Sequence, residues 1–344
     1  MADEMVLEQT PNQGPAEPAP MLSVEGLGVR FATDVGWVRV VDDVSFTVAP
    51  KETVGLVGES GSGKSVTSLA IMGLLPKRQS RVDGRIDFGG TDLLALPKRE
   101  LEDVRGRRLS MIFQEPMTSL NPAFTIGDQI GTVCRRHLGM DRRAAKRRAA
   151  EMLDRVGIPN AEQRVDDYPH QFSGGMRQRA MIALALSCEP SMLIADEPTT
   201  ALDVTIQAQI LDLIREQADQ NDMSVLFITH DLGVVADICD RVVVMYAGQV
   251  VESGTAEEVF LEPQHPYAEG LLRAMPSVEG SNHELAIIPG SVPPPTEFPV
   301  GCRFAGRCAY AQPQCDEPVP LTAVGSKRMV RCARHAELDL EGAK

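Results

Sequence analysis

Hydrophobic and polar residues alternate over residues 22–57, most regularly in the segment VSFTV at 44–48. A period of two residues predicts half-buried strands, so we expect antiparallel β-structure near the N-terminus. Three short runs are mostly apolar and predict buried strands, as in a parallel sheet. These runs cover residues 53–57, 192–195 and 225–229.

The pattern becomes mostly helical between about residues 115 and 175. A shorter helix is expected over residues 65–75, where Pro76 would stop it. Residues 242–251 predict a hairpin that turns at Ala247 and Gly248. Strands that alternate with helices along the chain predict an α/β fold.

A glycine-rich segment follows the first buried strand. Residues 58–65 have the sequence GESGSGKS and fit the phosphate-binding pattern G-x-x-x-x-G-K-[ST] at each fixed position. Glycine permits positive φ angles that let backbone N–H groups surround a phosphate, and the helix N-terminus that follows favours an anion. Lys64 is expected at the β- and γ-phosphates of a nucleotide, and the Ser65 hydroxyl at Mg²⁺. The other expected nucleotide contacts are Gly58, Ser60, Gly61, Ser62, Gly63 and Val66.

Two adjacent carboxylates end the apolar run at 192–195. Asp196 and Glu197 would lie at the carboxyl edge of the sheet, where open α/β sheets bind their ligands. Asp196 is expected to hold Mg²⁺, and Glu197 to act as the general base for an attacking water molecule. The pair therefore predicts hydrolysis as well as nucleotide binding.

With its further motifs, the chain resembles an ABC-type ATPase. Residues 172–178, FSGGMRQ, are similar to the family's signature, usually LSGGQ, and depart from it at Phe172 and Met176. Residues 196–203 are similar to the joined Walker B motif and D-loop. Residues 111–116 resemble the Q-loop and residues 228–231 the switch region, all in the family's order.

The resemblance implies an α/β fold with a RecA-like core, an antiparallel β subdomain and a helical subdomain. It also implies that two ATPase domains meet head to tail, with each ATP between the phosphate loop of one and the signature of the other. Ser173 and Gly175 would contact the γ-phosphate held by the partner, and Asp203 would communicate across the dimer. In its own site, His230 would contact the γ-phosphate, while Gln114 would sense Mg²⁺ and water.

An aromatic side chain upstream of the phosphate loop usually stacks on adenine in this family. Phe31 is the candidate here, and Trp37, the only tryptophan, is the alternative. Either ring could instead pack within the N-terminal sheet, so the sequence leaves both interpretations open.

The net charge of the chain indicates which kinds of binding partner are unfavourable. With 34 Lys and Arg against 48 Asp and Glu, the net charge of −14 disfavours binding to nucleic acid or anionic lipid. This disfavours a soluble ABC ATPase that acts on DNA or the ribosome. Basic residues do gather in the helical stretch, where a solvated helix face is favoured over a binding patch. They are Arg135, Arg136, Arg142, Arg143, Lys146, Arg147 and Arg148.

No run of 18 or more apolar residues occurs, so no membrane span is expected. Residues 1–20 are acidic and rich in proline, lack the apolar core of a signal peptide, and predict a flexible arm. We therefore expect the chain at the cytoplasmic face of the bacterial inner membrane, held there by partner subunits.

The composition changes beyond Pro263, so we expect an ATPase domain over 21–262 and a small C-terminal domain over 263–344. Residues 264–270, QHPYAEG, and the proline-rich stretch with residues 301–304 resemble the tail of ATPases from oligopeptide and dipeptide importers. Nickel importers share much of this tail, so nickel or another small solute stays an alternative to peptides. The resemblance implies a second, similar ATPase, two transmembrane permease subunits and an extracytoplasmic peptide-binding protein as partners.

Four of the seven cysteines lie close together in this C-terminal region. Disulfides are disfavoured in a reducing cytosol, and four thiolates suit structural zinc or an iron–sulfur cluster. Zinc sites usually contain closely spaced C-x2-C to C-x4-C pairs, which are absent here. A [4Fe–4S] cluster is favoured, because some peptide-importer ATPases carry one, with zinc or unligated thiols as alternatives. The expected ligands are Cys302, Cys308, Cys315 and Cys332.

Overall fold

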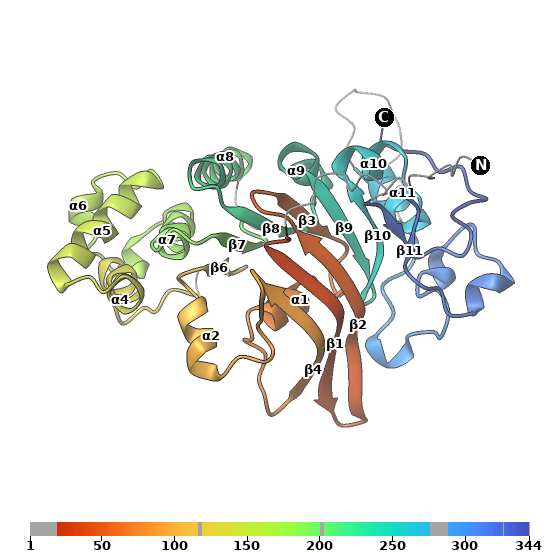
Figure 1. The fold of residues 1–344 in the computed structure, drawn as a ribbon. Helices are drawn as coiled ribbons and strands as arrows, with labels where there is room; N and C mark the ends of the chain where they lie inside the picture. Colours follow the sequence, from red (N-terminus) through yellow and green to blue (C-terminus); the bar gives the residue numbers. More distant parts are fainter. Residues whose placement is uncertain (1–18, 116–118, 200–202, 276–287, 326, 344) are drawn as a thin grey trace, which may run out of the picture.

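The chain folds around two β-sheets, with a group of helices at one end and the C-terminal segment at the other (Figure 1). The computed structural model describes residues 19–115, 119–199, 203–275, 288–325 and 327–343. The arm expected at residues 1–20 lies outside these ranges apart from its last two residues.

The first sheet is antiparallel and has the strand order β2-β1-β4-β5. One face of each long strand packs into an apolar core that includes Val24, Val44 and Ile86. The alternation over residues 22–57 is thereby confirmed as β-structure. The strands are β1 (Leu22–Thr33), β2 (Gly36–Val48), β4 (Ser80–Phe88) and β5 (Thr91–Asp92).

The second sheet has the order β11-β12-β10-β9-β3-β8-β7-β6 and is parallel from β9 to β6. The three apolar runs form β3, β7 and β8, whose residues are almost completely buried, as expected for strands covered on both faces. The predicted hairpin is also confirmed, since β9 and β10 turn at Ala247 and Gly248, which both have positive φ. The strands are β3 (Thr53–Val57), β6 (Leu109–Ile112), β7 (Met192–Asp196), β8 (Ser224–Thr229), β9 (Arg241–Tyr246) and β10 (Gln249–Thr255).

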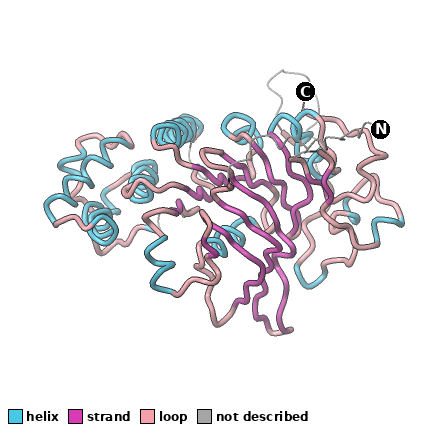
Figure 2. Tube along the Cα trace, in the orientation of Figure 1, coloured by secondary structure: helices cyan, strands magenta, loops and turns pink. Residues whose placement is uncertain are grey.

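Helices cover this sheet on both faces, as Figure 2 shows. The helix after the phosphate loop, α1 (Lys64–Ile71), ends before the expected Leu75. Gly73 takes a left-handed conformation with φ 61°, and the Leu74 N–H donates to the Leu69 carbonyl, which closes the helix before Pro76. The other helices around the sheets are α2 (Lys98–Val104), α8 (Val204–Gln220), α9 (Leu232–Ile238) and α10 (Ala256–Leu261).

The helical group at the end of the molecule packs against β6 through α7. Thr125, Asp141 and Ser173 each start a helix here by accepting a backbone N–H at its first turn. The helices are α4 (Ile126–Leu138), α5 (Arg142–Arg155), α6 (Ala161–Arg164) and α7 (Gly174–Leu186), with a 3₁₀ turn at Pro169–Gln171.

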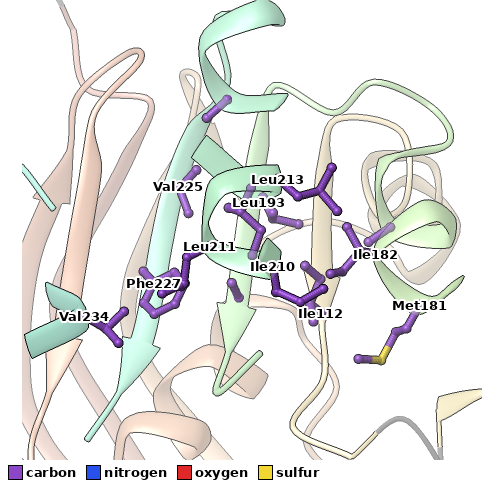
Figure 3. Packing of buried hydrophobic residues seen from close by; sticks show 14 of the residues in the cluster. Ile112, Met181, Ile182, Leu193, Ile210, Leu211, Leu213, Val225, Phe227 and Val234 are labelled. Atoms are coloured by element: carbon purple, nitrogen blue, oxygen red, sulfur yellow. The ribbon is translucent and has the colours of Figure 1, made fainter. Parts of the chain in front are cut away.

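The larger core lies between the second sheet and its covering helices (Figure 3). Leu193, Val225 and Phe227 of the sheet meet Ile182 of α7 and Ile210 of α8 there. The same continuous cluster extends into the helical group and into the C-terminal segment, for example to Phe304. The helical group and the sheet therefore share one core.

The C-terminal segment completes the second sheet. Strands β11 (Thr322–Ala323) and β12 (Met329–Val330) extend it beyond β10, and α11 (Pro266–Arg273) packs into the large core. The buried carboxylate of Glu252 accepts hydrogen bonds from the guanidinium of Arg328 and from two backbone N–H groups after α10. The boundary expected near residue 263 thus marks a change in composition, whereas the packing continues across it.

Candidate functional site

The phosphate loop connects β3 to α1 and lies against the β9–β10 hairpin. A Cβ atom on Gly58 would lie 2.1 Å from the carbonyl oxygen of Met245, so only glycine fits there. The Gly248 N–H donates to the Ser62 carbonyl at 2.8 Å and fixes the other side of the loop. The φ angles of the three loop glycines are 150° at Gly58, 81° at Gly61 and 103° at Gly63.

Lys64 is the first residue of α1 and is 5% exposed. Its Nζ atom donates to the carbonyl oxygens of Gly58 at 2.6 Å and Glu59 at 3.0 Å. Burial lowers the pKa of this ammonium group, and the carboxylates of Glu197 and Asp196 oppose that effect. The loop therefore holds a partly desolvated cation, which an incoming phosphate would stabilise.

Ser65 and Asp196 come together where the loop meets the end of β7. The Ser65 hydroxyl donates to Asp196 Oδ1 at 3.2 Å, and the Ser68 hydroxyl donates to Oδ2 at 3.4 Å. Burial raises the pKa of Asp196, and the adjacent Glu197 carboxylate raises it further. A hydroxyl and a buried carboxylate are oxygen donors of the kind that Mg²⁺ prefers, so this pair fits a magnesium ion.

Glu197 lies at the centre of a second polar group. Gln114 donates from Nε2 to Glu197 Oε2 at 3.0 Å, and His230 Nδ1 lies 3.3 Å from Oε1. Glu197 itself has φ 47°, and its N–H donates to the Ile228 carbonyl of β8. Three residues expected to act together, from the ends of β6, β7 and β8, are thus brought together at one edge of the sheet. A carboxylate held this way can orient a water molecule and accept its proton.

The signature lies at the N-terminus of α7, where Ser173 is exposed and accepts a hydrogen bond from the Met176 N–H at 3.3 Å. Gly175 follows in the first turn of α7, and Asp203 caps α8 by accepting from the Ile206 N–H. Because α7 packs on β6, three strands from β3, the signature lies apart from the chain's own phosphate loop. Met176, which departs from the family pattern, packs against the large core.

The two candidate adenine residues lie on the β1–β2 ribbon. Phe31 is partly buried and packs against the core of the antiparallel sheet. Trp37 is 41% exposed and has the Arg81 guanidinium 4.1 Å from its ring centroid, in a cation–π arrangement.

The four C-terminal cysteines line one cavity of about 10 Å³, together with His265 and Phe304. All four are free thiols, and burial raises the pKa of Cys302 to about 11. Among the described residues, no three His, Cys, Asp or Glu side chains stand in an arrangement that would hold a metal ion as they are placed. The thiols thus converge on one place without a formed coordination shell.

Several contacts of the site could not be predicted from the motifs. Gln178, inside α7, is buried and donates to the carbonyl of Pro198 after the catalytic strand, which links the signature helix to Glu197. Glu59, a variable position of the phosphate loop, is held by Tyr267 and Arg307 of the C-terminal segment. The acidic character of Glu59, next to Gly58, was the only sign in the sequence of its contact with Arg307.

Comparison with known families agrees with this site. Residues 41–200 match the ABC transporter family, and residues 251–315 match the oligopeptide/dipeptide transporter C-terminal region. The chain therefore belongs to the ABC transporter family, in the branch that carries the oligopeptide/dipeptide C-terminal region.

Relatives in two bacteria are named as peptide import ATP-binding proteins. One from Brucella abortus is 52% identical over 314 residues, which cover 91% of this chain and 95% of that protein. Another from Brucella melitensis is 52% identical over 332 residues, which cover 93% and 98%. The likeness thus includes both the ATPase core and the C-terminal segment.

Solved structures confirm the ABC ATPase fold. The ATP-binding cassette MJ0796, in a dimeric post-hydrolysis state bound to ADP and Pi, is 25% identical with a TM-score of 0.62, over 69% of this chain and 99% of that chain. CbiO1 from Clostridium perfringens, part of the ABC transporter complex CbiONQ, is 27% identical with a TM-score of 0.58, over 70% and 90%. Within the described ranges, no helix has the length and apolar character needed to cross a membrane.

Proposed function

We propose that this chain is the ATP-binding and ATP-hydrolysing subunit of a bacterial ABC importer for dipeptides or oligopeptides. The observation that carries this proposal is the convergence of Lys64, Ser65, Asp196 and Glu197 beside one glycine loop. The peptide specificity is supported by the relatives at 52% identity and by the match of the C-terminal region.

Within one ATP site, each group of residues has a different chemical role. The backbone N–H groups of residues 58–65 and the Lys64 ammonium bind the β- and γ-phosphates. Ser65, Asp196 and Gln114 would hold Mg²⁺, and the ion would supply positive charge to neutralise the phosphate oxygens. The buried, hydrogen-bonded position of Asp196 supports this assignment.

Glu197 acts as the general base. Its carboxylate accepts a proton from the water molecule that attacks the γ-phosphorus, and ADP leaves. The contacts with Gln114 and His230 fix the direction of that carboxylate. His230 would also contact the γ-phosphate. The 12% exposure of the Glu197 side chain limits competing solvent.

The complete site requires a second ATPase domain. Ser173 and Gly175 lie away from the loop of their own chain, and the exposed Ser173 and half-buried Gly175 suit contact with an ATP held by a partner. The N-terminus of α7 favours that anion. Asp203, at the start of α8, lies at the same interface and communicates with the partner site. The partner is a similar ATPase, and two permease subunits hold the pair at the cytoplasmic face of the inner membrane, where an extracytoplasmic peptide-binding protein delivers the peptide.

Phe31 is the residue that stacks on adenine. Its ring belongs to the sheet beside the phosphate loop, and it is only partly buried, which leaves a face for the base. One face of the Trp37 ring, by contrast, is already covered by Arg81.

The four-cysteine cavity is the place for the [4Fe–4S] cluster, within a small C-terminal unit. The donor types suit a cluster, because four free thiols from separate turns line one cavity, and the thiols would have to move apart to admit it, since the cavity has only about 10 Å³. Burial raises the pKa of the Cys302, Cys308 and Cys332 thiols, so a cluster would have to deprotonate these three on binding. Anaerobic purification should yield brown protein with about four irons per chain; colourless, iron-free protein would remove the cluster.

The ATPase activity is tested on the purified full chain. The wild type should hydrolyse ATP in a Mg²⁺-dependent way, and Lys64→Ala should lower the rate to background because the phosphates lose their buried cation. Hydrolysis that persists in Lys64→Ala would place the activity outside this loop. A nickel importer of the same branch remains the second candidate, since its tail is similar.

A further inference from the structure

The C-terminal segment is attached directly to the phosphate loop. Arg307, in the turn between Cys302 and Cys308, donates from both terminal nitrogens to the two carboxylate oxygens of Glu59, at 2.6 and 3.0 Å. These residues are 248 positions apart in the chain. A bidentate guanidinium–carboxylate pair of this kind fixes direction as well as distance.

A second bond reaches the same loop residue. The Glu59 backbone N–H donates to the Tyr267 hydroxyl at 2.8 Å, and Tyr267 is fully buried in α11. Tyr267 is held in turn by Tyr246 and Phe304, with ring centroids 4.6 and 5.3 Å away. Glu59 is therefore anchored at both its side chain and its backbone.

Arg307 is itself well fixed. Its side chain is 7% exposed, and its Nε atom donates to the Pro289 carbonyl at 2.8 Å. The Tyr246 hydroxyl lies 3.3 Å from the same guanidinium. The anchor thus belongs to the packed C-terminal segment and is no loose surface pair, although the Glu59 side chain is 32% exposed.

The anchored residue supports the nucleotide-binding lysine. The Glu59 carbonyl accepts one hydrogen bond from Lys64 Nζ, and the Gly58 carbonyl before it accepts another. Rotation of the peptide plane at Glu59 would therefore move Lys64. A short chain of bonds runs from Arg307 and Tyr267 through Glu59 to Lys64.

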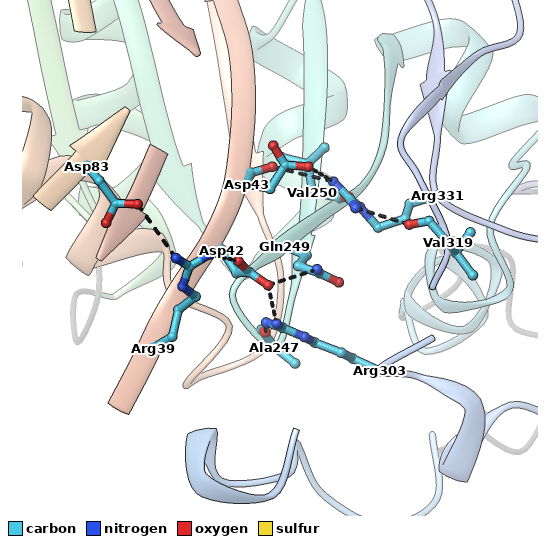
Figure 4. Close-up of polar contacts among 10 residues, drawn as sticks. All are labelled: Arg39, Asp42, Asp43, Asp83, Ala247, Gln249, Val250, Arg303, Val319 and Arg331. Carbon is cyan, nitrogen blue, oxygen red and sulfur yellow. Dashed lines mark hydrogen bonds and ion pairs between the residues drawn. The ribbon is translucent and has the colours of Figure 1, made fainter. Parts of the chain in front are cut away.

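Arg303 makes a second set of contacts from the C-terminal segment, which Figure 4 draws. Arg303 donates to the Ala247 carbonyl and to Asp42, and the adjacent Gly248 N–H donates to Ser62 in the loop. Arg303 and Arg307, which make these two sets of contacts, both lie between Cys302 and Cys308 in the C-terminal segment.

We propose that Arg307 is a positioning residue for ATP binding, which sets the phosphate loop and Lys64 through Glu59. The inference rests on the proposed ATP site. It assigns to the C-terminal segment a part in nucleotide binding, in addition to its place in the sheet.

The test is ATP affinity of the purified full chain, measured by titration with a non-hydrolysable Mg²⁺–ATP analogue. Arg307→Gln should raise Kd about tenfold, and Arg307→Lys should recover part of the loss, because it restores the charge without the paired hydrogen bonds. Tyr267→Phe, which removes one oxygen atom from a packed ring, should raise Kd by a smaller factor.

A double-mutant cycle separates this path from general damage. Glu59→Gln should weaken binding like Arg307→Gln, and the double variant should bind no more weakly than the poorer single variant. The matched control is Arg331→Gln. Arg331 is 8% exposed and joins the same segment to Asp43 and to the Val250 carbonyl instead of to Glu59 (Figure 4). The Arg331→Gln variant should lower Tm as Arg307→Gln does, but its Kd for the ATP analogue should equal that of the wild type.

Three results would overturn the proposal. Arg307→Gln and Tyr267→Phe could both bind the analogue as tightly as the wild type while Lys64→Ala does not bind. The effects of Arg307→Gln and Glu59→Gln could multiply. Arg331→Gln could raise Kd as much as Arg307→Gln. A wild type that fails to bind the analogue would instead contradict the proposed function itself, and this inference with it.

Discussion

Glu197 shows how the backbone places one functional group. The residue follows a buried strand and has φ 47°, which turns its carboxylate toward Gln114 and His230. Positive φ is uncommon for a residue with a side chain and is typical of functional sites.

Glu197→Gln should keep ATP binding and lower the hydrolysis rate at least about 100-fold, because an amide cannot accept the proton of the attacking water. Single-turnover hydrolysis and analogue binding on the same preparation measure the two effects. A rate within tenfold of the wild type would assign the base to another residue.

Gly58 is required for a steric reason that the motif alone does not state. Gly58→Ala should lower the free energy of unfolding by more than 2 kcal/mol, roughly, because its Cβ atom would lie 2.1 Å from the Met245 carbonyl oxygen.

Gly61→Ala is the matched control, since it has φ 81° but nothing within 4 Å of the added atom. It should cost about 1 kcal/mol from backbone conformation alone. Urea unfolding without nucleotide compares the two, and equal losses would contradict the steric argument.

At the scale of elements, α5 is tied to the end of α7. Arg148 of α5 donates to Glu189 at 2.8 Å and to the Ser187 carbonyl, just beyond α7. The Arg148 hydrogen bond holds the pKa of Glu189 below its ordinary value of 4.5. A carboxyl with a lowered folded-state pKa stabilises the fold fully above its unfolded pKa, and this stabilisation is lost as the pH falls through the folded-state pKa.

Glu189→Gln should therefore reduce the free energy of unfolding by about 0.5 kcal/mol at pH 7, a small value because Glu189 is half exposed. The difference from the wild type should shrink as the pH falls below about 4.5. Denaturant curves at several pH values measure it, and a difference that grows toward low pH would show that the ion pair is not its source.

The sequence predicts strands well where all residues of a strand are buried, or where buried and exposed residues alternate. The apolar runs became β3, β7 and β8, and the alternation became β1 and β2. Strand β4 was not predicted, because charged residues such as Arg81, Asp83 and Asp87 interrupt its apolar positions. Strands β11 and β12 have two residues each and exist only by pairing with β10, so no local pattern could predict them.

The same limit applies to the site. Residues within one motif, such as Lys64 and Ser65, are fixed by local spacing, and their chemistry could be predicted directly. The pairing of Glu59 with Arg307 depends on how the C-terminal segment folds back, across 248 residues. Contacts of that kind follow from the tertiary fold and leave no periodic signal in the chain.

At the scale of the whole molecule, the phosphate loop and the signature lie on different parts of the sheet. In the proposed mechanism, two domains therefore meet to complete a site. Glu197→Gln should associate with the companion ATPase of its transporter in Mg²⁺–ATP, and the complex should separate when ATP is removed.

Adding Ser173→Arg should prevent this association, because a long cation would fill the exposed start of α7, which is the proposed docking place of the partner's ATP. Light scattering coupled to gel filtration measures the mass. Association that is indifferent to ATP or to Ser173→Arg would contradict a nucleotide-bridged interface.

The central claim is ATP-driven peptide import, and uptake of a labelled peptide tests it most directly. Cells that lack the native gene would carry this chain or its Glu197→Gln variant, with equal expression of the whole transporter and with excess Ni²⁺ as a competitor. We predict that only the intact chain restores uptake and that nickel leaves it unchanged. Equal uptake with both chains, or uptake that nickel abolishes, would contradict the claim.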